Sequence, residues 1–189
     1  PVYLTRDYIV EKCSNLKNPQ GIIAAVEKPD NKLQEILKAG KPVVILDGIN
    51  DPGNLGTIIR TADAFGFGGV LLLKGCADAY SPKTVQSTMG SILRTSCTDI
   101  DINDIDKIKA NGYDIYGMDL RGTDMSSQSF GDVAAAVIIG SESHGVSNDI
   151  LAKCDKRLKI NMSGNAESLN AAVAAGIILN KVAGSLDRK

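Results

Sequence analysis

Short runs of aliphatic, mostly β-branched residues alternate with helix-like stretches along the chain, and this alternation limits the possible folds more than any other feature. Five such runs are expected as strands, over residues 43–46, 70–73, 113–120, 134–139 and 157–160. The runs are short and are bounded by Gly, Pro, Asn and Asp. Strands separated by helices form parallel sheets, so the sequence predicts an α/β fold with a mostly parallel sheet and helices on both faces.

Helix boundaries follow from capping residues and apolar periodicity. The apolar residues of 54–66 recur every three or four positions, with Asn54 expected as the N-cap and Gly66 as the terminator. A long Ala-rich helix is expected over 168–183, with Ser168 as its N-cap. Three further helices are expected over 31–40, over 82–93 and at the end of an Asp-rich segment spanning 99–109.

The composition is that of a globular protein. The chain has 189 residues, of which 43% are hydrophobic, and its formal net charge is −1. That apolar fraction supports a sizeable core in one compact domain and excludes disorder for most of the chain. The longest apolar stretches, 134–139 and 171–179, are shorter than the roughly 18 to 20 residues of a membrane-spanning helix, so no membrane partner is expected. Near-neutral charge argues against a wholly basic nucleic-acid surface and leaves a local basic patch open.

The cysteines are widely spaced along the chain. They are Cys13, Cys76, Cys97 and Cys154, and the single histidine is His144. No pair has the spacing of a metal-binding motif, so no metal site is expected. Scattered cysteines of this kind are typically small buried hydrophobes of a reducing compartment, and we therefore expect a cytoplasmic protein.

The first 28 residues differ in pattern from the rest of the chain. Residues 20–26 have the pattern of a strand, and residues 28–31 form a polar turn. We expect a domain boundary between residues 28 and 40. Residues 1–28 are then the remnant of an N-terminal domain with its linker, and residues 29–189 form the main domain.

Polar residues and glycines collect where the expected strands end. After the first strand, residues 47–56 form a Gly-, Asn- and Pro-rich turn that opens the helix carrying Arg60. Such a turn places backbone N–H groups at a crevice suited to an anion. It lacks the spacing of a P-loop or a dinucleotide fingerprint, so an ordinary turn followed by a solvated arginine stays an equal alternative.

A second cluster follows the fourth expected strand. In residues 138–147 an apolar strand enters a loop in which Gly140 and Gly145 flank Glu142 and His144. The glycines let the backbone approach a ligand closely. His144 has the chemistry of a general base, but an exposed loop histidine is the simpler interpretation.

The third cluster, residues 158–170, crowds Ser, Asn and Gly into a loop before the last helix. A capping role accounts for Ser168. It does not account for Asn170, because Asn is a weak helix former and stands here in the first turn of an Ala-rich helix.

Taken together and in this order, the three clusters resemble the motifs of the SpoU family, also called TrmH, of RNA ribose 2′-O-methyltransferases in the SPOUT superfamily. The matching stretches are residues 50–56 with Arg60, 81–85 with 89–90, 140–145, and 160–162 with 167–170. Each motif alone is weak, but their order and spacing across residues 43–183 make the resemblance specific.

The resemblance implies a parallel α/β sheet whose C-terminal segment forms a deep trefoil knot, with S-adenosyl-L-methionine bound at the knot. It also implies a homodimer with its active site near the subunit interface, methyl transfer to a ribose 2′-hydroxyl of RNA, and no metal. The residues that match the family's cofactor contacts are Gly140, Ile160 and Leu169, with Leu120 added. Those that match its catalytic and structural polar set are Asn54, Arg60, Glu142, Ser168 and Asn170.

The reaction implied by the resemblance needs an oxygen held in line with the methyl group and partial removal of its proton. The family proposal makes the residue matching Arg60 the base, but a guanidinium stays protonated in proteins. Clamping the phosphate next to the target ribose is the less costly role for Arg60. Asn54 and Asn170 are then expected to orient the ribose, and Glu142 and Ser168 to hold the loops.

Two positions depart from the family pattern. Asn161 stands where the family has Pro, which is expected to loosen the cofactor loop, and Gln86 stands where an Arg is expected, which removes a phosphate contact. Residues 19–26 resemble the closing strand of a small ribosomal-protein-like RNA-binding domain, which favours ribosomal RNA over transfer RNA as substrate. Three alternatives stay open: transfer RNA methylation, a catalytically silent RNA-binding or assembly factor of the same fold, and a nucleotide- or phosphosugar-binding enzyme.

Overall fold

The computed structural model describes residues 1–14, 16, 18–131 and 134–186. By its internal contacts the chain divides into two compact units, Pro1–Asp30 and Asn31–Lys189. No helix within the described ranges is both long and apolar enough to cross a membrane.

The first unit contains helix α1 (Asp7–Cys13). Residues 20–26, expected as a strand, have no regular secondary structure, and Ile22 and Val26 are exposed. A strand needs the free edge of another strand to satisfy its N–H and C=O groups. The described residues of this unit form no strand that could supply such an edge.

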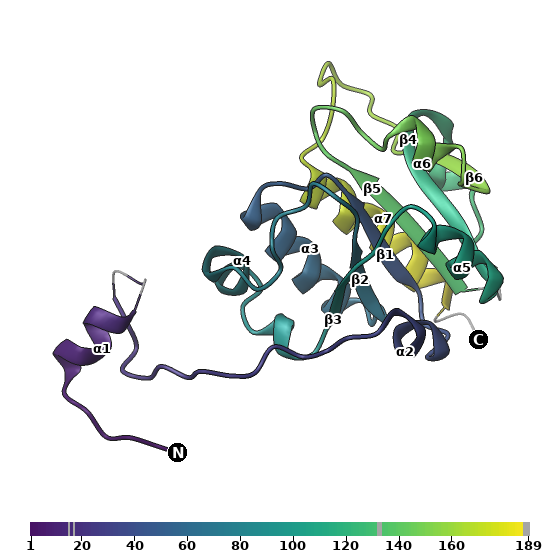
Figure 1. Cartoon of the computed structure of the whole chain (residues 1–189). Coiled ribbons are helices and arrows are strands. Elements are labelled where there is room, and N and C mark those ends of the chain that lie inside the picture. The colour runs from purple at the N-terminus through teal and green to yellow at the C-terminus, as the bar shows by residue number, and fades with distance from the viewer. Residues whose placement is uncertain (15, 17, 132–133, 187–189) are drawn as a thin grey trace. The chain divides into compact units, whose positions relative to one another are not determined.

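The second unit is built on a six-stranded sheet in the order β3-β2-β1-β5-β4-β6 (Figure 1). Every neighbouring pair of strands is parallel. The strands are β1 (Val43–Asp47), β2 (Gly69–Leu72), β3 (Ser96–Asp99), β4 (Tyr113–Asp124), β5 (Ala134–Gly140) and β6 (Lys156–Lys159). The expected parallel α/β fold is confirmed, and the knot stays a prediction.

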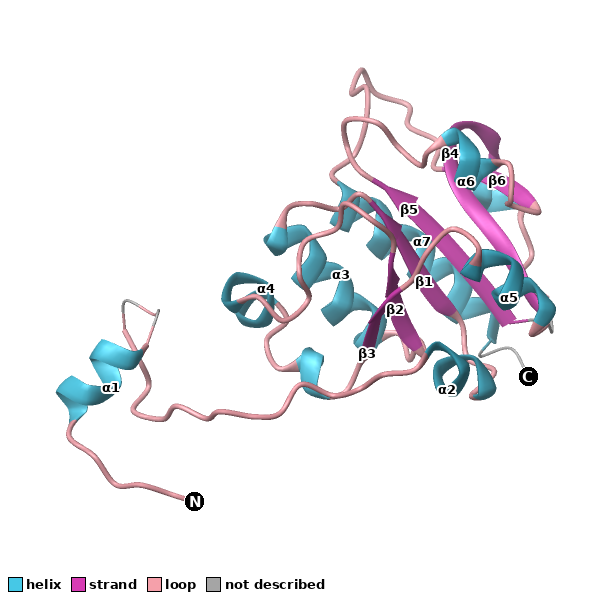
Figure 2. Ribbon diagram, in the orientation of Figure 1, coloured by secondary structure: helices cyan, strands magenta, loops and turns pink. Residues whose placement is uncertain are grey.

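Helices cover both faces of this sheet (Figure 2). The helices are α2 (Leu33–Lys38), α3 (Pro52–Ala64), α4 (Pro82–Ser87), α5 (Asp104–Ala110), α6 (Asn148–Leu151) and α7 (Ala171–Leu186), with 3₁₀ turns η1 (Ser91–Leu93) and η2 (Met125–Ser127). Alternate residues of β1 point to opposite faces: Val44 packs in the core beneath α3 and α7, and Ile45 in the core beneath α2, α5 and α6. Burial on both faces explains why the central strands are apolar without interruption.

Helix α3 begins three residues earlier than expected, and its cap is a different residue. Asp51 is the N-cap: its Oδ1 accepts a hydrogen bond from the Asn54 backbone N–H at 2.8 Å, and Pro52 occupies the first helical position. Asn54 therefore lies in the first turn, and its side chain is available for other contacts.

Helix α7 also begins at a different residue from the one expected. Ser168 is not its N-cap, because the helix starts at Ala171. Asn170 caps it, since its Oδ1 accepts hydrogen bonds from the N–H groups of Ala172 and Val173 at 3.0 and 3.3 Å. The placement of Asn170, which a cap at Ser168 could not explain, is explained by this role.

The segment expected as one helix over 82–93 is divided. Helix α4 ends at Ser87, and Met89 and Gly90 follow with φ of 50° and 88° before η1. Residues with positive φ cannot continue a right-handed helix. Strand β3 and helix α6 were not expected, because β3 reads Ser-Cys-Thr-Asp and α6 has only 4 residues.

The cysteines differ in exposure. Cys97 is buried as expected, whereas Cys13 is exposed, so the expectation of burial is wrong for Cys13. Burial raises the pKa of the Cys97 thiol to about 12 and that of Cys154 to about 11. Only a thiolate is nucleophilic, so iodoacetamide at about pH 8 is expected to modify Cys13 and to spare Cys97 and Cys154 until the protein unfolds. Peptide mass spectrometry checks this, and equally fast alkylation of Cys97 and Cys13 in the native protein would contradict it.

Candidate functional site

The carboxyl ends of the central strands place the three sequence clusters beside one another. Strands β1 and β5 are neighbours, and Asp47 at the end of β1 is in register with Gly140 at the end of β5. The loops that follow both strands therefore leave the sheet at the same level. A crevice at the carboxyl ends of parallel strands is the usual ligand position in open α/β sheets.

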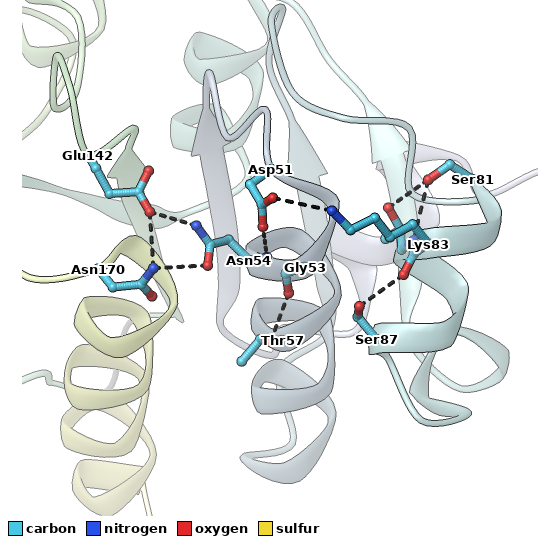
Figure 3. A network of polar contacts seen from close by, with 10 residues as sticks. Asp51, Gly53, Asn54, Thr57, Ser81, Lys83, Ser87, Glu142 and Asn170 are labelled. Carbon is cyan, nitrogen blue, oxygen red and sulfur yellow. Dashed lines mark hydrogen bonds and ion pairs between the residues drawn. The ribbon is translucent and has the colours of Figure 1, made fainter. Parts of the chain in front are cut away.

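A polar cluster joins these loops to the start of α7, and we call Asn54, Glu142 and Asn170 the amide–carboxylate cluster (Figure 3). The Asn54 Nδ2 donates to Glu142 Oε1 at 2.6 Å, and the Asn170 Nδ2 donates to the same oxygen at 3.2 Å. Asn170 Nδ2 also lies 3.0 Å from Asn54 Oδ1. Residues separated by up to 116 positions in the sequence thus form one hydrogen-bonded group.

Glu142 is the centre of this cluster. Its Oε1 accepts a third hydrogen bond, from the backbone N–H of Ala171 in the first turn of α7, at 3.2 Å. The carboxylate therefore satisfies a helix N-terminal N–H, where negative charge is favoured. These three contacts connect the loop after β5 to the first turns of α3 and α7.

A pocket of about 480 Å³ lies next to the cluster, between the loops after β5 and β6 and the end of β4. It is lined by all four residues named for cofactor binding, Leu120, Gly140, Ile160 and Leu169. Glu142 and Ser168 also line it, and apolar side chains make up much of the remaining wall: Met118, Ile139, Val146, Leu151, Leu158 and Met162. An apolar wall with a few polar groups is typical of small-molecule sites.

Gly140 has no room for a side chain. A Cβ built on it would lie 2.0 Å from the carbonyl carbon of Gly145 and 2.2 Å from the Val146 nitrogen. The loop folds back on itself here, with a bridge between Ser141 and Gly145, and Gly145 has a φ of +65°. Both glycines are therefore required by the backbone path of the pocket wall.

The opposite wall comes from an irregularity in β4. Met118 and Thr123 both pair with Leu158 of β6, so residues 119–122 bulge out of the ladder. Gly122 lies against the β6 backbone, where a Cβ would be 2.6 Å from the Arg157 carbonyl carbon. The bulge carries Asp119, Leu120 and Arg121 to the pocket.

Sequence reasoning missed Asp119 and Asp51. Asp119 stands inside an apolar strand pattern, and nothing local predicts that the strand bulges there. Asp51 could have been found, because an Asp followed directly by a Pro at the first helical position is a known N-cap signal. Its second oxygen lies 3.8 Å from Lys83 Nζ at the start of α4 (Figure 3).

Arg60 does not line the pocket and is exposed on α3. None of the hydrogen bonds or ion pairs found among the described residues involves it. Asn54 and Arg60 are six positions apart, so their side chains leave the helix about 120° apart. Within one chain, Arg60 and the amide–carboxylate cluster do not meet.

His144 lines the pocket and is exposed, as expected for a loop histidine. Its Nδ1 lies 2.7 Å from the Ser143 hydroxyl oxygen. Over the ranges that the structure describes, no group of three or more His, Cys, Asp and Glu residues is arranged to hold a metal ion.

Asn161, expected to loosen the loop, is held by a side-chain contact. Its Nδ2 donates a hydrogen bond to Asp124 Oδ2 at the end of β4, while its neighbours Ile160 and Met162 line the pocket. The Ser126 backbone and side chain hold the pKa of Asp124 below its usual value, so this acceptor is charged at neutral pH. The contact restrains the loop that a proline would otherwise stiffen.

Replacing Asn161 with alanine is expected to weaken binding of the pocket ligand about threefold to tenfold, because a charge-assisted hydrogen bond that restrains the pocket loop is lost at an exposed position. Titration calorimetry with S-adenosyl-L-methionine, the cofactor that the resemblance implies, measures this. Asp124→Ala should have the same effect, and the double variant should be no worse than either single one. Fully additive losses would contradict a role for this contact.

Comparisons with known proteins, by sequence and by structure, both return RNA methyltransferases of the SpoU or TrmH family. Residues 41–180 match the family model described as the SpoU rRNA Methylase family. The chain is 36% identical over 183 residues to the 23S rRNA (guanosine(2553)-2'-O)-methyltransferase RlmP of Bacillus subtilis, covering 96% of this chain and 72% of that protein. It is 37% identical over 142 residues to a putative TrmH family tRNA/rRNA methyltransferase of Staphylococcus haemolyticus, covering 74% of this chain and 57% of that protein.

A solved structure extends the likeness to three dimensions. The SpoU methyltransferase AviRb from Streptomyces viridochromogenes, in complex with AdoMet, superposes with a TM-score of 0.77 at 31% identity. The match covers 86% of this chain and 68% of that one. The stretch matched by the family model, 41–180, contains both the pocket and the amide–carboxylate cluster.

Proposed function

The chain belongs to the SpoU rRNA methylase family, and we propose that it transfers a methyl group from S-adenosyl-L-methionine to a ribose 2′-hydroxyl of RNA, with ribosomal RNA as the substrate class. The observation that carries this proposal is the position of Glu142, which belongs both to the pocket wall and to the amide–carboxylate cluster. A methyl donor in the pocket would therefore adjoin amide groups suited to a ribose.

The residues of the pocket fit this cofactor. A volume of about 480 Å³ suits a nucleoside with a short amino-acid tail, since small-molecule sites span roughly 300–1,000 Å³. Ile160 and Leu169 offer apolar contact for an adenine ring, and the close backbone at Gly140 offers main-chain hydrogen-bonding groups. When bound, S-adenosyl-L-methionine supplies an electrophilic methyl group and a neutral leaving group, so the protein has to position the acceptor and manage one proton.

In the proposed mechanism the amide–carboxylate cluster orients the acceptor ribose. Asn54 and Asn170 present amide groups beside Glu142, which lines the pocket and fixes both side chains through its Oε1. Arg60 clamps the phosphate next to the target ribose and stabilises the developing negative charge on the 2′-oxygen. Ser168, exposed on the pocket wall, helps to hold the loop before α7.

We propose that the site is completed in a homodimer, because Arg60 is remote from the cluster within one chain. Helix α7 exposes Val173 and Ile177, which are 52% and 39% accessible, and α7 packs beside α3, which carries Arg60. Apolar side chains on a helix next to a site are suited to a self-complementary interface. Sedimentation is expected to give about twice the chain mass of 19.9 kDa, and Val173→Asp with Ile177→Asp should give monomers without activity. A fully active wild-type monomer would contradict the proposal.

We further propose that residues 1–28 belong to an RNA-binding domain and that the protein acts in the cytoplasm. The match to the Bacillus relative extends over 183 residues, beyond the 41–180 of the family model. The first unit also exposes apolar side chains that its own residues leave uncovered, among them Val2, Leu4 and Ile22.

The experiment that tests the substrate class offers the protein two unmethylated RNAs, in vitro transcripts of 23S ribosomal RNA and of a transfer RNA set, with labelled cofactor. Label in the ribosomal transcript alone is expected. Label in the transfer RNA alone would favour transfer RNA as the substrate class, which the name of the Staphylococcus relative also includes. Cofactor binding without transfer to either RNA would favour the silent relative.

A further inference from the structure

Asp119 is a buried carboxylate in the wall of the pocket, and no role has been assigned to it above. It lies in the β4 bulge, and its side chain is only 8% exposed. Oδ1 accepts a hydrogen bond from the Arg121 backbone N–H at 3.0 Å. Oδ2 is fully buried and has no hydrogen-bond partner among the described residues.

Two arginines stand near this carboxylate without filling its lone pairs. Arg157 Nη1 lies 3.6 Å from Oδ2, and Arg121 Nε lies 3.6 Å from Oδ1. Both separations exceed a normal hydrogen bond. The arginines therefore offset the charge that burial disfavours, but Oδ2 still lacks a donor. Buried polar groups are nearly always hydrogen-bonded, so an unpaired carboxylate oxygen in a binding pocket indicates a partner that the protein itself does not supply.

Oδ2 is fully buried, so a ligand reaches it only if neighbouring side chains move, and the arginine side chains on both sides of the carboxylate are partly or largely exposed. The Arg121 side chain is 80% exposed and lines the pocket beside Asp119. An exposed, rotamer-rich side chain moves at little cost, and Arg121 keeps its backbone bond to Oδ1 when it does. The Arg157 side chain on β6 is 46% exposed and stands on the β6 side of the carboxylate.

We propose that Asp119 is a cofactor-binding residue, whose Oδ2 accepts a hydrogen bond from an O–H or N–H donor of the bound cofactor. The inference rests on the proposed function, because it assumes that S-adenosyl-L-methionine occupies the pocket. An ionised carboxylate is an acceptor only, so it selects donors. The cofactor has donors of this kind in its ribose hydroxyls, in its adenine 6-amino group and in its α-ammonium group.

The experiment measures affinities by titration calorimetry for the full chain and for Asp119→Asn. Three ligands are used: S-adenosyl-L-methionine, S-adenosylhomocysteine and 5′-methylthioadenosine, which keeps the nucleoside and lacks the amino acid. Asp119→Asn is expected to weaken the first two at least about tenfold, because a charge-assisted hydrogen bond is lost in a desolvated site. A tenfold loss for 5′-methylthioadenosine as well assigns the donor to the nucleoside, that is, to a ribose hydroxyl or the adenine 6-amino group, and an unchanged affinity for it assigns the donor to the ammonium group.

The matched control is Asp114→Asn on the same strand. Asp114 accepts a hydrogen bond from the Tyr116 hydroxyl and lies outside the pocket, so cofactor affinity should stay within twofold of wild type. Asp119→Asn could place its NH₂ group against Arg157. If the melting temperature of Asp119→Asn falls by more than about 5 °C, the double variant Asp119→Asn with Arg157→Ala is measured instead, because it removes the repulsion between the new NH₂ group and Arg157. Arg157→Ala alone is then the reference for the double variant.

The possible results separate a failure of the proposed function from a failure of the role of Asp119. Wild-type protein that binds none of the three ligands overturns the proposed function and this inference with it. Wild-type protein that binds S-adenosyl-L-methionine, with Asp119→Asn within twofold of its affinity, overturns only the role of Asp119. An equal loss in the Asp114→Asn control would also overturn it, since the effect would then belong to charge on β4 in general.

Discussion

Replacing Arg60 with alanine is expected to lower the rate of methyl transfer by about 100- to 1,000-fold, because removing one donor to a developing negative charge has effects of that size. Arg60 is exposed on α3 and does not line the pocket. Affinity for S-adenosyl-L-methionine should therefore stay within about twofold of wild type, since no contact in the pocket is lost. Single-turnover kinetics and calorimetry measure the two quantities separately.

Two variants of Arg60 together distinguish a phosphate clamp from a base. Arg60→Lys keeps the positive charge but loses the planar fork that binds a phosphate through two hydrogen bonds, so it should recover only part of the rate. A titrating limb in the pH–rate profile that persists in Arg60→Ala would exclude Arg60 as the group that takes the proton. Full activity of Arg60→Ala would contradict any role for this residue.

Replacing Gly140 with alanine is expected to reduce cofactor affinity by about 100-fold or more. The new Cβ would lie 2.0 Å from the Gly145 carbonyl carbon, so the backbone of the pocket wall has to move. Overpacking against backbone costs about 1–3 kcal/mol or more, and about 3 kcal/mol corresponds to about 100-fold in affinity. Calorimetry with S-adenosyl-L-methionine measures this loss, and the melting temperature should fall as well.

The matched control for this change is Gly164→Ala in the loop before α7. A Cβ on Gly164 would meet nothing within 4 Å, and its φ is not in the left-handed region. Its cofactor affinity and melting temperature should both stay close to those of the wild type. Equal losses in the two variants would show that the loops tolerate no side chain anywhere, rather than that Gly140 is specifically required.

The parts of the fold that could be predicted are those set by local pattern. Short aliphatic runs identify β1, β2 and β5, because both faces of these strands are covered and the pattern is unbroken. Strand β3 could not be found in this way, since Ser-Cys-Thr-Asp has no apolar run and is held by pairing with β2. Residues 20–26 show the converse, a strand-like pattern without a strand.

The residues of the site could be predicted more completely from the family resemblance than from local sequence patterns such as capping and apolar periodicity. The resemblance named all the residues of the amide–carboxylate cluster and five further residues of the pocket, Leu120, Gly140, Ile160, Ser168 and Leu169, but not their contacts. That Glu142 receives hydrogen bonds from both Asn54 and Asn170 depends on the strand order, which brings the ends of β1 and β5 together. The β4 bulge that brings Asp119 to the pocket depends on the pairing register between β4 and β6, which cannot be predicted from the local sequence of either strand.

The most direct test of the proposed function is to locate the methyl group in the product. The protein is incubated with unmethylated ribosomal RNA and S-adenosyl-L-methionine carrying a labelled methyl group, and the RNA is digested to nucleosides for mass spectrometry. One labelled 2′-O-methylnucleoside is expected, whose phosphodiester linkage resists alkali, and this product should be lost with Arg60→Ala. Label on a base, or product of equal yield from Arg60→Ala, would contradict it.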